Sequence, residues 1–565
     1  MKFARIVLLG LAMAAPASAP ISAQVIAKHE MIAAANPLAA AAGLQMMKQG
    51  GSAVDAAIAT QMVLNLVEPE SSGIGGGAFM LLYDPRSGKT TSFDGRESAP
   101  ASAIPTMFLG ADGQPRAKRD AIPGGLSVGV PGVVAMLEMA HRKYGRLPWA
   151  RLFEPAITLA ENGFPAGKKF ANTIARTPQT AAMPDIKRTF YHPDGTPIKE
   201  GEIVRNPELA ASLRAIARGG AKAFYRGAIA QAIVDAVQHA PQNQGGMTLA
   251  DLAGYKAKER APVCGDYRIW HLCSMGPPSS GGVAIVQIMG MLQHFPSSQL
   301  QPGTVSEAHL YTQASRLAYA DRLKYMADTD FVQVPLAGLT DPDYIASRAA
   351  LIDPAKDMGT AIAGEPPQKH ADYAPQTSPV LHGTSHMTIV DRSGEVIAMT
   401  TSVESVYGAQ IMAKGFLLDN TLTDFSLDPT LNGQPVANAP GPGKRPLSAM
   451  SPTIVFDKDG HFYLSVGSPG GPAIIDFVAQ TLIAMLDGGL KPQDAIAQPS
   501  ILNMNGPTML EKGPQSEALA AQLGSLGHTV RVVEGESSGL HGIEKTPDGY
   551  IGGADPRRDG VVLGD

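Results

Sequence analysis

The pattern of apolar residues changes abruptly near residue 383, and this change constrains the fold more than any other feature of the chain. Before it, most apolar residues recur with helical spacing, over residues 37–48, 53–66, 131–234, 283–295 and 307–326. Beyond it, short apolar runs alternate with turns, at residues 387–390, 396–400, 453–456 and 462–466, and one more helical stretch follows at 472–486. Strands that follow a helix-rich first half predict an α+β fold.

Two segments of the first half do not fit helices. Residues 79–83 and 90–94 are apolar runs separated by a turn, which predicts a β-hairpin. Residues 353–379 are rich in Pro, Ala, Gly and Lys and lack periodicity, which is typical of a mobile linker. The border between the two parts of the chain therefore falls at the end of this linker.

The composition excludes several classes of protein. The chain has 565 residues, of which 44% are hydrophobic, and this is enough for a sizeable core and too many for a disordered chain. Lys and Arg number 46 against 51 Asp and Glu, so the formal net charge is −5. This mild acidity argues against a nucleic-acid-binding protein, which needs a concentrated basic surface.

The N-terminus has the three parts of a secretory signal peptide. Residues 2–5 carry two basic side chains, residues 6–15 form a short apolar core, and small residues follow. This core is too short to cross a bilayer, which takes about 20 apolar residues. We expect cleavage after Ala23, because a cut at the A-x-A pattern of residues 17–19 leaves a proline beside it. A bacterial protein of the periplasm or the medium, free of the membrane once the signal peptide is removed, is the expected product; a buried N-terminal helix is the alternative.

The two cysteines exclude a disulfide-stapled fold and a four-cysteine zinc site. Cys264 and Cys273 lie nine positions apart, on either side of a Gly-Asp-Tyr-Arg turn. Two short strands joined by this turn could bring the side chains face to face, and an oxidising compartment then allows a disulfide. The sequence leaves this pairing and two unpaired thiols equally open.

Two familiar motifs occur without the context that they need. Residues 73–78 match the G-x-G-x-x-A string of dinucleotide-binding folds, but a strand-like run follows where a helix is required. Residues 125–129 match the G-x-S-x-G nucleophile elbow, yet a helix cannot begin at Ser127 because the next possible start is a proline four residues later. The histidines at 370, 382 and 386 lack metal-ligand spacing, and we expect them to be solvated.

One threonine gives the main indication of chemistry. Thr384 follows Gly383 at the end of the predicted linker and opens a buried strand. A threonine hydroxyl is a weak nucleophile, but the residue's own α-amino group can activate it. That amine has a pKa of about 7.7–8.0, near working pH, and it is free only if the Gly383–Thr384 bond is cut. We expect the hydroxyl to make this cut through an N→O acyl shift, because glycine leaves room for the attack. From these residues alone, an ordinary strand that begins with a threonine is the plainer interpretation.

Ordered motifs along nearly the whole mature chain resemble those of the γ-glutamyltranspeptidase (glutathione hydrolase) family of N-terminal nucleophile hydrolases. In the first part they are GSAVDAA at 51–57, SSGIGGG at 71–77, RESAP at 96–100, VPG at 130–132 and PPSSGG at 277–282. In the second part they are GTSH at 383–386, KRPLS at 444–448, MSPT at 450–453 and GSPGG at 467–471. So many strings in one order are specific to this family.

The resemblance implies a proenzyme that cleaves itself into a large subunit, residues 24–383, and a small catalytic subunit, residues 384–565. It implies a four-layer αββα sandwich in which two antiparallel sheets lie between helical layers. The implied activity is that of a hydrolase or transferase. It attacks γ-glutamyl amides such as glutathione, forms a γ-glutamyl-enzyme ester and passes the acyl group to water, an amino acid or a peptide. No metal and no organic cofactor is implied.

The resemblance also implies catalytic roles for four residues. Thr384 matches the nucleophile. Ser402 stands where the family has a second threonine that hydrogen-bonds the first, and serine keeps the hydroxyl. Gly470 and Gly471 match the pair whose backbone N–H groups form the oxyanion hole, where each donor is typically worth about 3–4 kcal/mol. Without the resemblance, this glycine pair is a tight turn before a helix.

Three more residues match those that bind the amino-acid head of the γ-glutamyl group. Arg96 matches an arginine that holds the α-carboxylate, which a guanidinium can bind with two hydrogen bonds. Ser448 matches one of two serines that bind the same carboxylate. Asp424 matches the aspartate that holds the α-ammonium. Without the resemblance, Arg96 is an ordinary loop arginine paired with a neighbour.

Three positions depart from the family pattern, and all three belong to the same head-group site. Ala449 replaces the second serine, which removes one hydrogen bond worth about 1 kcal/mol. Glu404 stands where asparagine is usual, and Thr421 where glutamine or glutamate is usual. Glu404 adds an acid near Asp424, which could suit an ammonium or mark a different substrate. The stretch between residues 425 and 444 is also shorter than in members with a lid, which implies an open site for bulkier donors.

Two other functions stay open. The first is an acylase-type relative that keeps the chemistry and cleaves a non-glutamyl amide, such as a glutaryl side chain. The second is an inactive relative that acts as a binding protein, against which the intact Gly383-Thr384 and Gly470-Gly471 pairs argue.

Overall fold

The computed structural model describes residues 25–376, 383–535 and 538–565. The expected signal peptide and His382 lie outside the described residues. In the part of the chain that is described, no helix is both long and apolar enough to span a membrane.

In the described ranges, two antiparallel sheets of seven strands each form the centre of the molecule, with the orders β23-β2-β10-β11-β3-β4-β7 and β1-β22-β21-β17-β16-β9-β8. The strands of the first sheet are β2 (Met31–Ala34), β3 (Gly77–Asp84), β4 (Lys89–Gly95), β7 (Lys258–Arg260), β10 (Ser385–Val390), β11 (Val396–Ser402) and β23 (Val561–Gly564). Those of the second are β1 (Val25–Ala27), β8 (Val263–Tyr267), β9 (Trp270–Ser274), β16 (Thr453–Phe456), β17 (Phe462–Gly467), β21 (His541–Thr546) and β22 (Gly549–Ala554).

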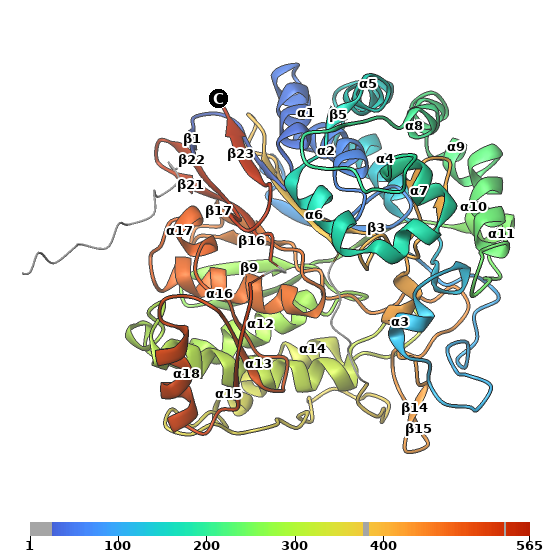
Figure 1. The fold of residues 1–565 in the computed structure, drawn as a ribbon. Coiled ribbons are helices and arrows are strands. Elements are labelled where there is room, and N and C mark those ends of the chain that lie inside the picture. The colour runs from blue at the N-terminus through green and yellow to red at the C-terminus, as the bar shows by residue number, and fades with distance from the viewer. Residues whose placement is uncertain (1–24, 377–382, 536–537) are drawn as a thin grey trace, which may run out of the picture.

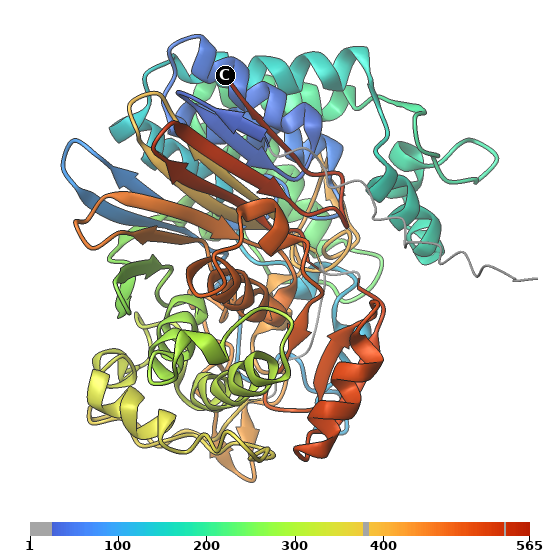
Figure 2. The ribbon, with the colours of Figure 1, turned by 90° about the vertical axis from the view of Figure 1, so that its left-hand side faces the viewer.

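Helices cover the outer face of each sheet, so the molecule has four layers (Figures 1 and 2). On the first sheet and beside it lie α1 (Pro37–Lys48), α2 (Ala53–Val67), α4 (Val133–Tyr144), α5 (Glu154–Asn162), α8 (Pro207–Gly219), α9 (Ala221–Tyr225), α10 (Ala228–Gln238) and α11 (Leu249–Gly254). On and around the second lie α12 (Gly281–Leu292), α13 (Val305–Tyr325), α14 (Leu336–Leu339), α15 (Pro342–Ala349), α16 (Ile474–Leu486), α17 (Pro492–Ile496) and α18 (Ser516–Ser525). The expected αββα sandwich is therefore confirmed.

Shorter elements surround these layers. They are the helices α3 (Lys118–Ala121), α6 (Lys168–Arg176) and α7 (Pro184–Phe190), the pairs β5 (Phe164–Pro165) with β6 (Ile203–Val204), β12 (Met412–Ala413) with β13 (Phe416–Leu417) and β14 (Thr430–Leu431) with β15 (Gln434–Pro435), and a small sheet of β18 (Ile501–Leu502), β19 (Thr508–Glu511) and β20 (Val530–Val533).

Alternate residues of the central strands belong to two different cores. In β3, Met80 and Leu82 pack with the helices α1 and α2, whereas Phe79 and Leu81 pack with the second sheet. Successive side chains of a strand point to opposite faces, and here both faces are covered. This is why the central strands are apolar runs instead of alternating polar and apolar residues.

Most of the elements predicted from the sequence are present. The helices expected at 37–48 and 53–66 are α1 and α2, and the hairpin expected at 79–94 is β3–β4. The described part of the predicted linker, residues 353–376, contains neither a helix nor a strand. The expectation of solvated histidines was wrong for His386, which is fully buried. It lies in β10 between two other strands, and its Nδ1 hydrogen-bonds Thr400 Oγ1 at 2.9 Å.

The change of pattern at residue 383 is not a boundary between separate domains. Strands β10 and β11 come after it, yet they lie between β2 and β3, which come before it. Met387 pairs with Ala34 on one side, and Thr401 pairs with Ala78 on the other. Both halves of the chain therefore build one sheet.

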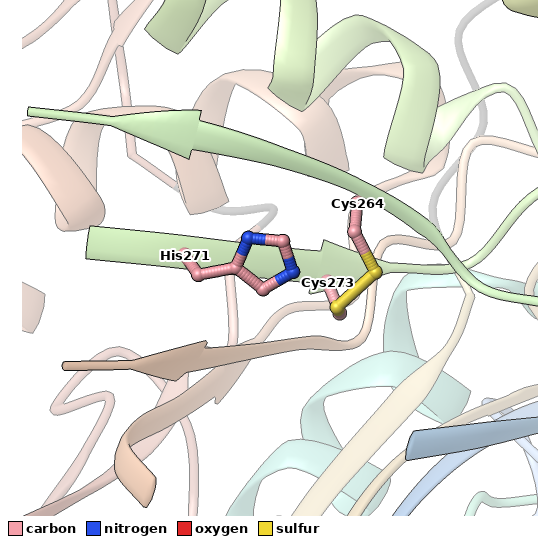
Figure 3. Close-up of side chains that lie close together, drawn as sticks. All are labelled: Cys264, His271 and Cys273. Carbon is pink, nitrogen blue, oxygen red and sulfur yellow. A yellow bond between two sulfur atoms is a disulfide. The ribbon is translucent and has the colours of Figure 1, made fainter. Parts of the chain in front are cut away.

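The hairpin of β8 and β9 carries the two cysteines. Cys264 and Cys273 are directly opposite each other in the strand pairing, and they form a disulfide (Figure 3). Of the two possibilities that the sequence left open, the structure has the bonded pair.

Candidate active site

Thr384 and Ser402 meet at the ends of two paired strands. Ser385, the first residue of β10, pairs with Thr401 near the end of β11, so the residues just beyond them also face each other. The two hydroxyl oxygens, Thr384 Oγ1 and Ser402 Oγ, are 3.0 Å apart. Thr384 is buried with 3% of its surface exposed. The strand pairing thus holds the predicted nucleophile beside a second hydroxyl.

Both hydroxyls contact the carbonyl of the bond that precedes Thr384. Thr384 Oγ1 donates a hydrogen bond to the carbonyl oxygen of Gly383, and Ser402 Oγ donates to the same oxygen at 2.6 Å. A side chain at position 383 would clash, because a Cβ there would lie 2.5 Å from the carbonyl oxygen of Glu404. Glycine is therefore needed for this approach. The hydroxyl lies next to the carbonyl group that the expected N→O acyl shift would attack.

A pocket opens beside Thr384, and seven of the nine predicted site residues line it. These are Arg96, Thr384, Ser402, Glu404, Asp424, Ser448 and Gly471. Gly470 directly precedes the last of them and has a φ of 135°, a conformation that glycine adopts most readily. Ala449 also lines the pocket. Residues from both parts of the chain meet here.

Arg96 is fully buried and makes contacts with each part of its guanidinium group. Its Nη2 donates to Asp424 Oδ2 at 2.6 Å and to the carbonyl oxygen of Leu447 at 3.2 Å, and its Nε donates to the carbonyl oxygen of Pro446 at 3.2 Å. Its Nη1 lies 3.5 Å from Glu97 Oε2. A lysine could not make this set of contacts, because only a guanidinium presents several donors in one plane. Arg96 links the segment after β4 to the two segments that carry Asp424 and Ser448.

A lysine that the sequence reasoning missed reaches the same acid. Lys118, at the start of the short helix α3, has its Nζ 3.5 Å from Asp424 Oδ1, and its side chain is 11% exposed. Asp424 therefore contacts two cations in the structure. Nothing in the sequence distinguishes Lys118 from the charged side chains next to it, Arg116, Arg119 and Asp120. Only the fold brings α3 to the pocket.

Glu404 lies among these charges and holds its proton unusually tightly. Burial, followed by the negative charge of Asp424, raises the pKa of Glu404 from 4.5 to about 8, although the charges of Lys118 and Arg96 act against this. The carboxyl group is therefore mostly neutral at pH 7 and becomes an anion above about pH 8. Glu404 has a φ of 78°, and its backbone N–H donates to Ser402 Oγ at 2.8 Å.

The segment that carries Ser448 is hydrogen-bonded to a segment from the first half of the chain. Ser280 donates to the carbonyl oxygen of Ser448 from its backbone N–H at 2.9 Å and from its hydroxyl at 2.7 Å. Arg322, a buried residue of α13 that also lines the pocket, donates from Nε to Ser280 Oγ at 2.8 Å. Among the described residues its Nη1 has no hydrogen-bond partner. Arg322 is a second guanidinium at this pocket, and the sequence analysis missed it because it lies within an ordinary helical pattern.

One predicted site residue, Thr421, lies outside the pocket, and the rejected serine Ser127 is held in a turn. Thr421 is fully buried and is not part of the pocket lining; its backbone N–H donates to Asp419 Oδ1 at 2.8 Å. Ser127, the serine of the rejected elbow motif, is buried and donates to the carbonyl oxygens of Ile122 at 2.5 Å and Gly124 at 3.1 Å. Its hydroxyl is engaged in a turn, in agreement with the rejection of that motif.

Comparisons with known proteins identify the family. The family described as Gamma-glutamyltranspeptidase matches residues 39–565. The chain is 38% identical over 568 residues to the Glutathione hydrolase proenzyme of Escherichia coli (strain K12), covering 97% of this chain and 95% of that one. It is 37% identical over 550 residues to the enzyme of the same name from Bacillus subtilis (strain 168), covering 95% and 92%. The crystal structure of cephalosporin acylase from Bacillus halodurans matches with a TM-score of 0.84 at 28% identity, covering 98% of this chain and 99% of that one. The chain is a member of the γ-glutamyltranspeptidase family.

Proposed function

We propose that this protein is a self-cleaving threonine hydrolase and transferase that acts on γ-glutamyl amides such as glutathione. The observation that carries the proposal is the placement of the Thr384 hydroxyl, in contact with the Gly383 carbonyl and 3.0 Å from Ser402 Oγ. The names of the relatives, glutathione hydrolase proenzymes, agree with it. The product of the cut is a large subunit ending at Gly383 and a small subunit beginning at Thr384.

The reaction has two halves that use one hydroxyl. The free α-amine of Thr384 accepts the hydroxyl proton, and Oγ1 attacks the γ-carbonyl of the donor. The amine of the donor leaves with a proton, as cysteinylglycine when the donor is glutathione, and a γ-glutamyl ester of Thr384 is left. Water then releases glutamate, or an amino acid or peptide takes the acyl group. Gly470 and Gly471 are the proposed donors to the oxyanion that forms in each half.

A denaturing gel and an anilide assay test this function. The purified wild-type chain should give two bands whose smaller fragment starts Thr-Ser-His-Met, and it should release the aniline from a γ-glutamyl anilide. A chain that stays as one band after long incubation, and that turns over neither the γ-glutamyl anilide nor a glutaryl anilide, would instead support a binding protein.

The chain also supports a second candidate with the same chemistry, an acylase that acts on a non-glutamyl amide. The observation that favours it is the position of Lys118, which contacts the acid expected to hold the donor's α-ammonium. Ala449 also removes one of the hydroxyls expected at the α-carboxylate. The likeness to a cephalosporin acylase agrees with this candidate. A glutaryl donor has no ammonium and needs no free acid, so a clear preference for a glutaryl anilide over the γ-glutamyl anilide selects the acylase.

Lys118→Met should shift the donor preference toward γ-glutamyl compounds. Without the lysine, Arg96 is the one cationic partner of Asp424 among those described above. The donor's α-ammonium then no longer competes with Lys118 for the Asp424 carboxylate. We expect KM for the γ-glutamyl anilide to fall about 3- to 10-fold, the effect of roughly 1 kcal/mol, and KM for the glutaryl anilide to stay or rise. Lys356→Met removes an exposed lysine and serves as the control. Equal changes for both donors would contradict the proposed contact.

Glu404 should make donor binding depend on pH. Its pKa of about 8 means that it is neutral below this pH and an anion above it. An anion next to Asp424 attracts an ammonium, so KM for the γ-glutamyl anilide should fall about 2- to 4-fold between pH 7 and pH 8, a range kept below pH 9 because the donor's own α-ammonium also loses its proton as the pH rises. Glu404→Gln should abolish this fall. The glutaryl anilide is the control donor, since its KM should not fall over the same range, and the Thr384 amine affects both donors and both variants alike.

We also propose that the chain is exported and loses residues 1–23. The charge and apolar pattern of this segment supports the proposal. Intact-mass measurement of the purified protein reports the signal cut and the self-cut together.

A further inference from the structure

The β8–β9 hairpin places metal-binding side chains on one face. Cys264 pairs with Cys273 and Asp266 pairs with His271. Opposed residues of an antiparallel pair share a face, and so do residues two positions apart on one strand. The four side chains therefore project from the same face of the hairpin, at the outer edge of the second sheet.

Three of these side chains are close enough to bind one ion. The ligand atoms of Cys264, His271 and Cys273 all lie within 4.8 Å of one another. Figure 3 shows the imidazole ring on the side of the two sulfur atoms, with one ring nitrogen toward them. Zinc accepts sulfur and imidazole nitrogen in tetrahedral sites, with metal–ligand bonds of about 2.0–2.3 Å. The two sulfur atoms are bonded to each other in the structure, so they must separate before both can bind such an ion.

The aspartate of the hairpin orients the histidine. His271 Nδ1 is 2.7 Å from Asp266 Oδ1, so the nitrogen available to an ion is Nε2. A carboxylate that holds the other nitrogen of a metal-binding histidine is the usual arrangement around such sites. A surface histidine paired with an acid is common by itself, but this pair is placed beside two cysteines.

We propose that Cys264, His271 and Cys273 form a zinc-binding site that is closed while the disulfide is intact and opens when a thiol reduces it. Two molecules of a thiol RSH give two cysteine thiols and one RS–SR, so atoms and electrons balance. Binding of the ion then releases the two thiol protons, and water completes the four ligands. Cys264 is half-buried and the His271 side chain is 48% exposed, so both reagents can reach the site.

The site lies on a strand that leads to the catalytic pocket. Strand β9 ends at Ser274, and the chain continues to Ser280, whose hydroxyl donates a hydrogen bond to the carbonyl oxygen of Ser448. The ion-binding site itself does not depend on the proposed function. If glutathione is the donor, both the donor and the released cysteinylglycine are thiols of the class that opens the site.

Cobalt titration tests the proposal, since Co²⁺ bound to thiolates gives a charge-transfer band that a carboxylate or histidine site lacks. The processed wild-type enzyme is reduced with a phosphine, desalted without oxygen and titrated with Co²⁺. We expect a thiolate–cobalt band that saturates at one ion per chain, disappears on addition of Zn²⁺ and is absent without reduction. The Cys264→Ser and Cys273→Ser double variant should lack the band.

Two further variants separate the site from ordinary thiols. Asp266→Asn should weaken cobalt binding about 10- to 100-fold, and His271→Ala at least as much. His461→Ala, in an exposed turn with two aspartates that forms a second group of possible ligand atoms, is the matched control and should not change the titration. The proposal is overturned if reduced wild type shows no band, if His271→Ala titrates like wild type, or if circular dichroism shows that reduction alone unfolds the chain. None of these readouts uses turnover, so they are independent of the failure or success of the proposed function.

Discussion

Thr384→Ala should leave the protein as one uncut chain with no measurable donor turnover. The substitution removes the hydroxyl that contacts the Gly383 carbonyl, so neither the self-cut nor the later attack can occur. Loss of a catalytic nucleophile typically costs about 10⁴-fold or more in rate. A denaturing gel and the γ-glutamyl anilide assay measure the two effects separately.

Thr401→Val is the matched control for this variant. Thr401 is also a buried threonine, one residue before Ser402, and its hydroxyl has no hydrogen-bond partner among the described residues. The Thr401→Val protein should be cut, and should turn over the γ-glutamyl anilide, as the wild type does. Thr384→Ser keeps a hydroxyl and should still be processed, more slowly. Processing of Thr384→Ala at the wild-type site would falsify the assignment of Thr384.

Arg96→Met should damage both stability and activity. The change leaves Asp424 and the buried Glu97 without their shared guanidinium partner and frees two carbonyl groups. Removal of one partner of a buried ion pair costs about 3–5 kcal/mol. We expect a matching loss in the free energy of unfolding and a drop in kcat/KM of about 10²-fold or more, because the pocket also loses its proposed carboxylate ligand.

Chemical denaturation measures the stability of Arg96→Met, and kinetics with the γ-glutamyl anilide measure its activity. Arg96→Lys keeps the charge but not the fork of donors, so it should fall between wild type and Arg96→Met. Arg119→Met is the control, since the Arg119 side chain is 88% exposed and its ion pair with Asp120, at 3.6 Å, is on the surface. An Arg96→Met protein as stable as this control would contradict the buried network.

The fold was predictable where one local pattern decides an element. The capped alanine-rich helix α2 and the hairpin β3–β4 have strong local signals, and both occur where the sequence predicted them. The layered arrangement came from the resemblance, because no local pattern says that β10 inserts between β2 and β11. The burial of His386 follows from that insertion, which is why it was predicted wrongly.

The site was predictable only where family motifs mark it. Thr384, Ser448 and Arg96 lie in such motifs, and the fold brings them to one pocket. Lys118 and Arg322 lie outside the motifs and reach the pocket through tertiary structure alone. Thr421 was singled out because it stands where the family usually has glutamine or glutamate, and the structure places it at a buried turn outside the pocket lining. Distances and protonation, such as the proton held by Glu404, depend on burial that no spacing in the sequence encodes.

The interleaving of β10 and β11 with β2 and β3 has a consequence for the severed protein. Among the described residues, five strand pairings join residues before the proposed cut to residues after it. If the chain is cut as proposed, the two fragments can come apart only when these pairings in both sheets break, so we expect dissociation to need global unfolding. Specific activity should not change on dilution, and fragments made separately should fail to combine unless they refold together.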